Sequence, residues 1–510
     1  MPRLLLTLIA LTTTIAVAAG CGSDGASSSG AAALAPRGSL VYGEATLRPE
    51  GDQKAAIENL VTKFPGEGSA GDRIRQLMEK AFSESDTNLS YADDIEPWLG
   101  DEAGFFVSSF DAASEDADAA LLVATDDEDA SVAAIEKDRD VRKTDHRGHD
   151  LYVSTEEEGA AAVVDGWLVI GNPGGVKAAL DTAEDGEPIE DDDTYNETLE
   201  DAPEERLGFV YVNTPALFEQ LEKTPQGVVF EQFREFFEDP FLVTANATGA
   251  GVRFEATVPA SVLAGIPIVA EGTGAAAELP ADSWLALAQP ELGKTLEVYA
   301  DLIGGALGGR DAIEEELKSA TGLDFREDVT SWMGDWGAFV RGATVEELDG
   351  ALFIETSDEA ASGRFIEAIA RLVEKNASLD TEVGPLTVEG GGQGFTVRST
   401  DVPQPIHLFQ RDGRVVAAYG DAAARDALDP AETLADTPAF RDAEEALGGD
   451  YAISFYLAIE PILSLVDSAG AASDEDWQKA KPYLEPLGAL VAGARKDGDK
   501  LRSAFGVTVK

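Results

Sequence analysis

Short apolar runs recur along the chain in two series that keep the same order. Each series opens with a run typical of a buried strand, at Leu40–Leu47 and at Trp284–Ala288. Apolar residues at helical spacing then predict two helices in each series, at Asp52–Phe64, Asp72–Ser83, Leu292–Gly308 and Asp311–Ala320. The pattern therefore predicts a strand followed by a pair of helices, and it predicts this arrangement twice.

The middle of each series predicts another strand that runs directly into a helix. The strands are expected at Ala119–Ala124 and at Ala351–Glu355. A Thr-x-x-Glu motif follows each strand, and this motif is typical of a capping box at a helix start. The two predicted boxes pair Thr125 with Glu128 and Thr356 with Glu359.

Each series continues with a hairpin and ends with neighbouring strands. Asp165-Gly166 and Asp412-Gly413 lie between apolar runs, which favours a type I′ turn because both turn residues need positive φ. Later runs predict strands at Leu207–Val212, Leu242–Ala247, Val252–Val258, Tyr451–Leu457, Leu490–Ala494 and Leu501–Val509. Hairpins outnumber β-α-β units in this pattern, so the sequence predicts an α+β fold with largely antiparallel sheets covered by helices.

The two series are also similar residue by residue. Ala120–Glu136 reads ALLVATDDEDASVAAIE and Ala351–Glu367 reads ALFIETSDEAASGRFIE, and the two segments align without a gap. Other matches keep the same order along both series. We therefore expect a tandem duplication of one fold, with repeat 1 at residues 38–278 and repeat 2 at residues 279–510.

The first residues have the pattern of an export signal that ends at the chain's single cysteine. Residues 1–20 carry Arg3, an uncharged apolar and Thr-rich run, and small residues before Cys21. This resembles the lipobox of bacterial lipoproteins, in which the signal is removed and the cysteine sulfur is joined to a lipid. The interpretation predicts a signal peptide at residues 1–20, lipidation of Cys21, and a flexible Ser/Ala/Gly-rich tether at residues 21–37. Ordinary secretion, after cleavage at a site of the Ala-x-Ala type, is the alternative.

The surface is expected to be strongly acidic, because 96 Asp and Glu residues against 38 Lys and Arg give a net charge of −58. This charge excludes nucleic acid as a partner, since its binding needs clustered basic side chains. Anionic lipid heads are repelled as well, so the membrane would be contacted through the N-terminal lipid anchor. No segment fits the EF-hand calcium loop, which makes a solvated acidic surface the simpler interpretation. A protein or ligand partner stays unknown.

Two motifs accompany the leader. Pro36–Tyr42 reads Pro-x-x-Ser-Leu-Val-Tyr, and Asp94–Asp101 reads Asp-Ile-x-x-Trp-Leu-Gly-Asp. Together with the lipobox they resemble an uncharacterised family of bacterial exported proteins, the domain of unknown function 3352 (DUF3352). The resemblance covers most of the mature chain and implies an extracytoplasmic lipoprotein. It implies no activity, cofactor or catalytic residue.

A short polar segment offers the weak candidates for metal binding. His146, His149 and Asp150 place two imidazoles and a carboxylate close together, and zinc or copper accepts such ligands. A zinc site normally takes three or four protein ligands, and the matching part of the second series near Gly391–Phe395 has no histidine. The alternative is a polar loop before a strand at Leu151–Ser154.

Trp98 and Trp332 occupy equivalent places in the two series. They could form platforms on which a ligand stacks, or they could pack two layers of the fold together. The flanking residues Ile95 and Val329 have the spacing of core positions, which favours the packing interpretation.

The motifs G-x-S-x-G, H-E-x-x-H and S-x-x-K with its companions do not occur in the sequence. We therefore expect no catalytic or cofactor-binding residue, and the leading hypothesis is a non-catalytic binding or interaction scaffold in the cell envelope. A carrier of lipid or another apolar ligand is one alternative, which a large apolar cavity would favour. An enzyme that uses carboxylates or a metal is the other.

Overall fold

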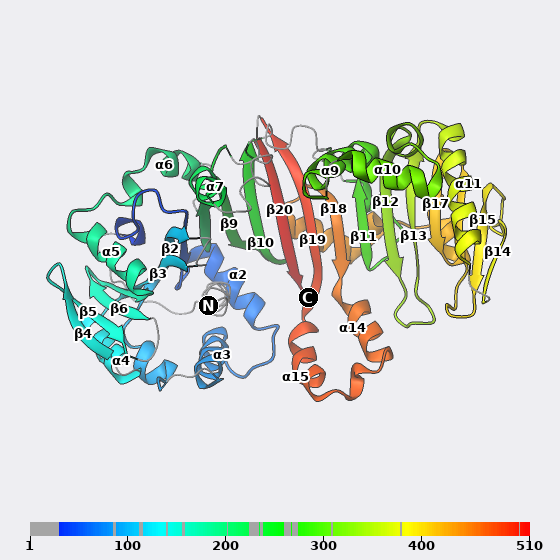
Figure 1. The fold of residues 1–510 in the computed structure, drawn as a ribbon. Helices are drawn as coiled ribbons and strands as arrows, with labels where there is room; N and C mark the ends of the chain where they lie inside the picture. Colours follow the sequence, from blue (N-terminus) through cyan, green and yellow to red (C-terminus); the bar gives the residue numbers. More distant parts are fainter. Residues whose placement is uncertain are drawn as a thin grey trace. The chain divides into compact units, whose positions relative to one another are not determined.

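The computed structural model divides the chain into two compact units, Met1–Val258 and Pro259–Lys510 (Figure 1). Both units combine helices with an antiparallel sheet, which is the α+β class expected from the sequence. The described residues are 30–84, 88–111, 116–138, 141–155, 159–200, 202–203, 205–223, 234, 238–259, 267, 274–307, 310–377, 380–498 and 500–510. Cys21 lies outside them, so its lipidation stays a prediction.

The described strands of the N-terminal unit form one antiparallel sheet. Its order is β10-β9-β8-β1-β2-β3-β7-β6-β5-β4. The strand bounds are β1 Val41–Thr46, β2 Leu99–Asp111, β3 Asp116–Thr125, β4 Val141–His146, β5 His149–Ser154, β6 Ala160–Val164, β7 Trp167–Gly171, β8 Gly208–Val212, β9 Phe241–Ala247 and β10 Gly251–Pro259.

Helices lie on both faces of this sheet. Their bounds are η1 Ala31–Ala33, α2 Gly51–Val61, α3 Ala70–Glu84, η2 Tyr91–Ile95, α4 Glu128–Asp138, α5 Pro173–Asp185, η3 Ile189–Asp191, α6 Asp193–Leu199 and α7 Thr214–Glu222. Along β3, Leu122 packs in the cluster that contains α5 and α6, whereas Leu121 packs in the cluster that contains α4. Because side chains alternate along a strand, these clusters cover opposite faces of the sheet.

The C-terminal unit has a sheet of the same kind. Its order is β20-β19-β18-β11-β12-β13-β17-β16-β15-β14. The strand bounds are β11 Leu285–Gln289, β12 Met333–Arg341, β13 Asp349–Thr356, β14 Thr381–Pro385, β15 Gln393–Ser399, β16 Ile406–Arg411, β17 Arg414–Tyr419, β18 Ala452–Ala458, β19 Leu487–Asp497 and β20 Lys500–Val509.

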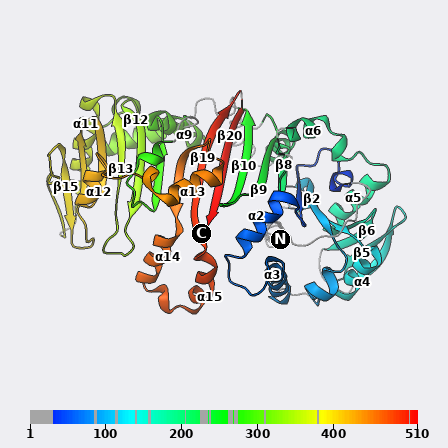
Figure 2. The same cartoon turned by 180° about the vertical axis from the view of Figure 1, so that it is seen from behind.

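Its sheet is also covered on both faces. The helix bounds are η6 Ala275–Glu278, α9 Leu292–Leu307, α10 Arg310–Thr321, η7 Phe325–Thr330, α11 Glu359–Asn376, α12 Asp421–Asp426, η8 Leu434–Asp436, α13 Pro438–Leu447, α14 Ile459–Ser468, η9 Ala471–Ser473 and α15 Glu475–Leu484. Val416 packs in the cluster of α12 and α13, whereas the preceding residue along the strand, Val415, packs in the cluster of α11. Figure 2 shows α12 and α13 on the face of the sheet that is turned to the viewer. In the described part of the chain, no helix is long and apolar enough to cross a membrane.

The strand orders of the two units correspond position by position. Adding ten to each strand number of the first order gives the second order. The register agrees as well, because Val107 pairs with Val41 as Val340 pairs with Leu285. The described sheets therefore have the same topology.

The predicted Asp-Gly turns are confirmed. Asp165 and Gly166 have φ of 51° and 79°, and Asp412 and Gly413 have φ of 52° and 75°. Positive φ at both residues is what a type I′ turn requires. In each unit the turn also fixes the end of the neighbouring strand, since the glycine carbonyl accepts the N–H of Thr125 at 2.9 Å and of Thr356 at 2.8 Å.

The predicted capping boxes are wrong by two residues. Asp358, not Thr356, caps α11, and its carboxylate accepts the N–H groups of Ala360 at 2.9 Å and Ala361 at 3.0 Å. Asp127 takes the same role before α4, where it accepts the N–H of Ala130 at 3.0 Å. Asp satisfies the free N–H groups as well as Thr and adds a charge that the helix dipole favours.

The last part of the predicted tether is also corrected by the structure. Ala31, Leu34 and Ala35 are buried in the core of the N-terminal unit, so a flexible tether does not extend to residue 37. The carbonyl of Ala35 accepts the N–H of Ile189 at 2.8 Å, and in the C-terminal unit Leu279 accepts the N–H of Leu434 at 2.8 Å. The small alanine side chains permit this close packing. The prediction failed because alanine-rich composition is also typical of flexible segments.

A tryptophan packs in the core at the same place in each unit. Trp98 is 3% exposed and Trp332 is 0% exposed, which confirms the packing interpretation. The indole N–H of each donates to the carbonyl of the aspartate four residues earlier, Asp94 at 2.5 Å and Asp328 at 2.9 Å. Each tryptophan thereby holds the turn η2 or η7 against the sheet.

Candidate functional site

The candidate site is a hollow in a helical hairpin of the C-terminal unit. Helix α14 follows β18, and α15 leads into β19, so both helices extend beyond the ends of these strands (Figure 1). The start of α15 is capped by Asp474, whose carboxylate accepts the N–H groups of Asp476 and Trp477, both at 3.0 Å. The start of α15 is therefore well defined, although much of the hairpin's surface faces solvent.

One aspartate fastens the two helices together. The carboxylate of Asp467 on α14 accepts the indole N–H of Trp477 at 2.7 Å and an ammonium N–H of Lys481 at 2.7 Å. Both donors lie on α15. The same Lys481 ammonium lies 3.8 Å from Glu485, one turn further along. Because each oxygen of Asp467 accepts a hydrogen bond from α15, this carboxylate fixes the spacing of the two helices.

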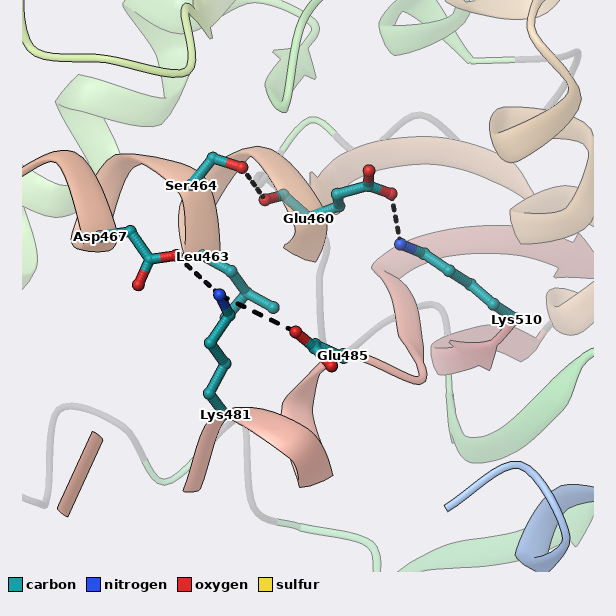
Figure 3. Close-up of a pocket in the computed structure, with 7 residues that line it drawn as sticks. All are labelled: Glu460, Leu463, Ser464, Asp467, Lys481, Glu485 and Lys510. Atoms are coloured by element: carbon teal, nitrogen blue, oxygen red, sulfur yellow. Dashed lines mark hydrogen bonds and ion pairs between the residues drawn. The ribbon is translucent and has the colours of Figure 1, made fainter. Parts of the chain in front are cut away.

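A second ion pair closes the other side of the hollow. Lys510, which follows β20, lies 2.5 Å from the carboxylate of Glu460 at the start of α14. Between the two ion pairs is a hollow of about 340 Å³. Figure 3 shows the side chains that line it, which are Glu460, Leu463, Ser464, Asp467, Lys481, Glu485 and Lys510.

The ion pairs set the charge states at this site. The hydrogen bond from the Lys481 ammonium has the largest effect on Asp467 and lowers its pKa. The hydrogen bond from the Trp477 indole lowers this pKa further. The Lys510 ammonium lowers the pKa of Glu460. The hydrogen bond to Asp467 raises the pKa of Lys481. Asp467 and Glu460 are therefore charged at neutral pH, and so is Lys481.

This arrangement is suited to holding charged groups. Acid–base chemistry at neutral pH needs a group whose pKa is moved toward 7, and the shifts of Asp467 and Glu460 go the other way. The hydroxyl of Ser464 donates to the backbone carbonyl of Glu460 at 3.2 Å, within its own helix. The hollow thus offers fixed charges of both signs above the apolar side chain of Leu463.

The structure places two of the predicted metal candidates, the histidines, in hydrogen bonds with a helix and the third, Asp150, in an ion pair with a strand. His146 and His149 flank the turn between β4 and β5, and their Nε2 atoms lie 2.8 Å from Asp181 and 3.0 Å from Glu184, both on α5. Asp150 lies 2.5 Å from Lys143 instead. Within the described residues, no group of three or more His, Cys, Asp or Glu side chains could hold a metal ion. The two histidines fasten the hairpin to α5.

The third histidine belongs to a buried polar row. His407 is 0% exposed, with Nδ1 at 3.0 Å from the Thr396 hydroxyl and Nε2 at 3.0 Å from Asp421. Hydroxyl, imidazole and carboxylate are also the groups of a nucleophilic triad. Here Thr396 is buried as well and its oxygen accepts the N–H of Thr387 at 3.1 Å, so no substrate reaches it. The row therefore runs from the buried Thr396 to the exposed carboxylate of Asp421 and connects β16 to α12.

Sequence reasoning did not find the hairpin hollow. Its partners Glu460 and Lys510 are far apart in the sequence, and each is one of many charged residues. The one local signal was the helix-capping pattern at Asp474, which locates α15 but not the hollow.

The comparisons with known proteins identify a family and little else. A family model described as "Protein of unknown function (DUF3352)" matches residues 4–490. No curated protein matches the chain.

Three solved structures of a protein named TP0453 are similar to parts of the chain. Crystal form III shares 10% identity at a TM-score of 0.25, covering 46% of this chain and 80% of that chain. Crystal form IV shares 11% at 0.25, covering 44% and 79%. Crystal form I shares 13% at 0.24, covering 45% and 78%. Such a weak likeness carries no argument about this chain. The family match, in contrast, spans nearly the whole sequence, and the chain therefore belongs to the DUF3352 family of proteins of unknown function.

Proposed function

We propose that this protein is a lipid-anchored scaffold outside the cytoplasm, built from two copies of one fold, which binds partners without catalysis. The anchor is proposed from the lipobox pattern that ends at Cys21. Only Gly22–Ser29 separates this cysteine from the first described residue, Gly30. A fully extended segment of that length spans at most about 30 Å. The N-terminal unit would therefore be held near the membrane surface.

The two-copy architecture is supported by shared details of the units. The strand order is the same, and so are the positive-φ Asp-Gly turns and the hydrogen bonds of Trp98 and Trp332. The short buried turns η1 and η6 precede the first strand of each unit. On this basis the copies would begin at Ala31 and Ala275, a few residues before the bounds suggested by the sequence alone.

The observation that carries the scaffold proposal is that large side chains fill both cores. In the N-terminal unit, the fully buried side chains include Trp167, Tyr42 and Phe106. In the C-terminal unit they include Trp332, Phe339 and Phe440. Protein interiors packed in this way leave little room for an apolar guest. The packing favours a scaffold over the alternative of a lipid carrier.

Lipid extraction distinguishes the scaffold from the carrier. The full chain is purified from its own membranes, and the Cys21→Ala variant is purified beside it. Organic extracts of both are analysed by mass spectrometry. A scaffold should yield no stoichiometric free lipid from either protein, whereas a carrier should yield lipid from both. Bound lipid in the Cys21→Ala variant would therefore contradict the proposal.

Labelling with fatty acid tests the anchor. The wild type should incorporate labelled fatty acid and partition into detergent, because an acyl chain adds roughly 0.8 kcal/mol of membrane affinity per buried CH₂. Cys21→Ala should lose the label and leave the membrane. Unlabelled wild type that is free in the medium would show ordinary secretion instead.

A further inference from the structure

The hairpin hollow presents carboxylates to solvent and keeps one of its lysines further inside. The side chains of Glu460 and Glu485 are 75% and 58% exposed, whereas that of Lys481 is 31% exposed. Each of the two glutamates meets a single ammonium group, at 2.5 Å and 3.8 Å. A carboxylate has about four acceptor positions, so both retain capacity for another donor.

The chain's own lysines show which group the hollow accommodates. Lys481 places its ammonium between Asp467 and Glu485, and Lys510 places its ammonium on Glu460 (Figure 3). The floor beside them is the buried Leu463. A basic side chain has the same two parts, an aliphatic stem and a cationic head. The volume of about 340 Å³ lies within the range of typical ligand sites.

The charge balance favours a cation over an anion. The lining residues carry three carboxylates against two ammonium groups. The rest of the hairpin adds the carboxylates of Asp474, Glu475 and Asp476 and one further lysine, Lys479. The whole chain adds a net charge of −58, which attracts cations and repels anions over longer distances.

We propose that this hollow is a docking site for a lysine or arginine side chain of a partner protein. The inference rests on the proposed scaffold function and names the chemistry of its partner. The basic head binds Glu460 and Glu485, and its stem packs on Leu463. Helix α15 extends the surface beside the hollow with the exposed ring of Tyr483, and a polypeptide can cover this larger area.

Peptide binding tests the proposal with the full chain in detergent. A fluorescent peptide of alternating lysine and serine is titrated into the wild type and into the Glu460→Gln/Glu485→Gln variant. The double variant should bind about tenfold more weakly, as expected from the loss of two exposed ion pairs. Free cadaverine should compete only at concentrations far above those of the peptide.

The matched control changes the same charge on the same hairpin outside the hollow. Glu475→Gln/Asp476→Asn removes two carboxylates from the first turn of α15, where the side chain of Asp476 is 96% exposed. This variant should keep wild-type affinity within about twofold, because exposed surface charges outside the hollow are screened by salt. Circular dichroism confirms that both variants are folded.

Three results would overturn the proposal. Equal weakening by both double variants would show diffuse attraction to an acidic surface. Unchanged binding by the Glu460→Gln/Glu485→Gln variant would place the peptide elsewhere. Competition by cadaverine at the same concentration as the peptide would identify a small-amine site. None of these results bears on the anchor or the lipid extraction, so the scaffold function is tested separately.

Discussion

In the N-terminal unit the first strand places Tyr42 and Glu44 on the face of the sheet that packs on α5 and α6. The corresponding strand of the C-terminal unit places Ala286 and Ala288 on the equivalent face. The Tyr42 hydroxyl donates to the Glu44 carboxylate, and the Tyr42 ring meets that of Tyr195 edge-on at 5.6 Å. Equivalent positions of the first strand thus carry a tyrosine and a glutamate in the N-terminal unit and two alanines in the C-terminal unit.

At the end of the second strand, β2 or β12, it is the C-terminal unit that carries the charged residue. Arg341 ends β12 and is buried among three carboxylates, Asp349 at 2.6 Å, Asp426 at 2.8 Å and Asp282 at 3.1 Å. The register places Ser108 at the corresponding position of the N-terminal unit, where its hydroxyl donates to the carbonyl of Asp118 at 3.2 Å. Shared pairing and shared tryptophans maintain the topology, whereas individual core positions accept different chemistry.

The largest expected effect tests what the units share. Trp98→Ala and Trp332→Ala should each lower the free energy of unfolding by about 3–5 kcal/mol, because each leaves a cavity and frees a backbone carbonyl. Urea denaturation followed by circular dichroism measures both. Trp477→Ala, on the solvent-facing hairpin, serves as the control with a smaller loss. If one core variant costs less than about 1 kcal/mol, the two tryptophans do not have equivalent roles.

The next prediction tests a feature of the C-terminal unit. Burial by itself lowers the pKa of Arg341, but hydrogen bonds to Asp349 and Asp426 raise it overall, so the guanidinium stays charged. Arg341→Met should lower the free energy of unfolding by about 3 kcal/mol, because it leaves carboxylates unpaired. Ser108→Ala should cost about 1 kcal/mol or less.

A second variant separates lost charge pairing from lost packing at Arg341. The double variant Arg341→Met/Asp349→Asn should recover part of the stability, since it removes the most buried of the three carboxylates. A double variant as unstable as Arg341→Met alone would show that packing, not pairing, is the main contribution of the arginine.

The Asp-Gly turns, which depend on adjacent residues, could be predicted from the sequence, whereas contacts between residues far apart in the sequence could not. The turn at Asp412-Gly413 follows from the φ angles that two adjacent residues must adopt. The buried row at His407 required Thr396 and Asp421 to come together from a different strand and a helix. Ala31–Ala35 shows a further limit, because alanine-rich composition is compatible with both a loose tether and a tightly packed turn.

A third prediction concerns pH and the polar cluster of the N-terminal unit. Burial raises the pKa of Glu44 from its usual 4.5, and the Tyr42 hydroxyl only partly opposes this. Glu102 adds repulsion and Arg206 adds attraction, and both act on the same carboxylate. Because the folded state holds the proton more tightly, Glu44 contributes stability below pH 4.5 that is lost as the pH rises through the folded pKa.

The Glu44→Gln variant isolates this contribution from the many other acidic groups. The free energy of unfolding of the variant, minus that of the wild type, should increase from pH 4.5 toward neutral pH. Urea denaturation at several pH values measures this difference. Glu102→Gln is a second test, because it removes repulsion that helps raise the pKa of Glu44 and should therefore weaken the pH dependence of the wild type. A difference for Glu44→Gln that does not depend on pH would mean that the carboxylate titrates normally.

The smallest expected effect concerns the hairpins at the sheet ends. The β4–β5 hairpin is fastened to α5 by hydrogen bonds of His146 and His149 at the surface, whereas β14 and β15 pack on α11 through side chains such as Phe395. His146→Asn and His149→Asn should each cost about 1 kcal/mol or less, which is typical of a single hydrogen bond. Phe395→Ala should cost about 3–5 kcal/mol, because it empties a buried site.

Zinc should leave the melting temperature of the wild type unchanged, since the two imidazoles bind different carboxylates. A zinc-dependent rise that disappears in His146→Asn would instead make this hairpin a metal site and not a fastening.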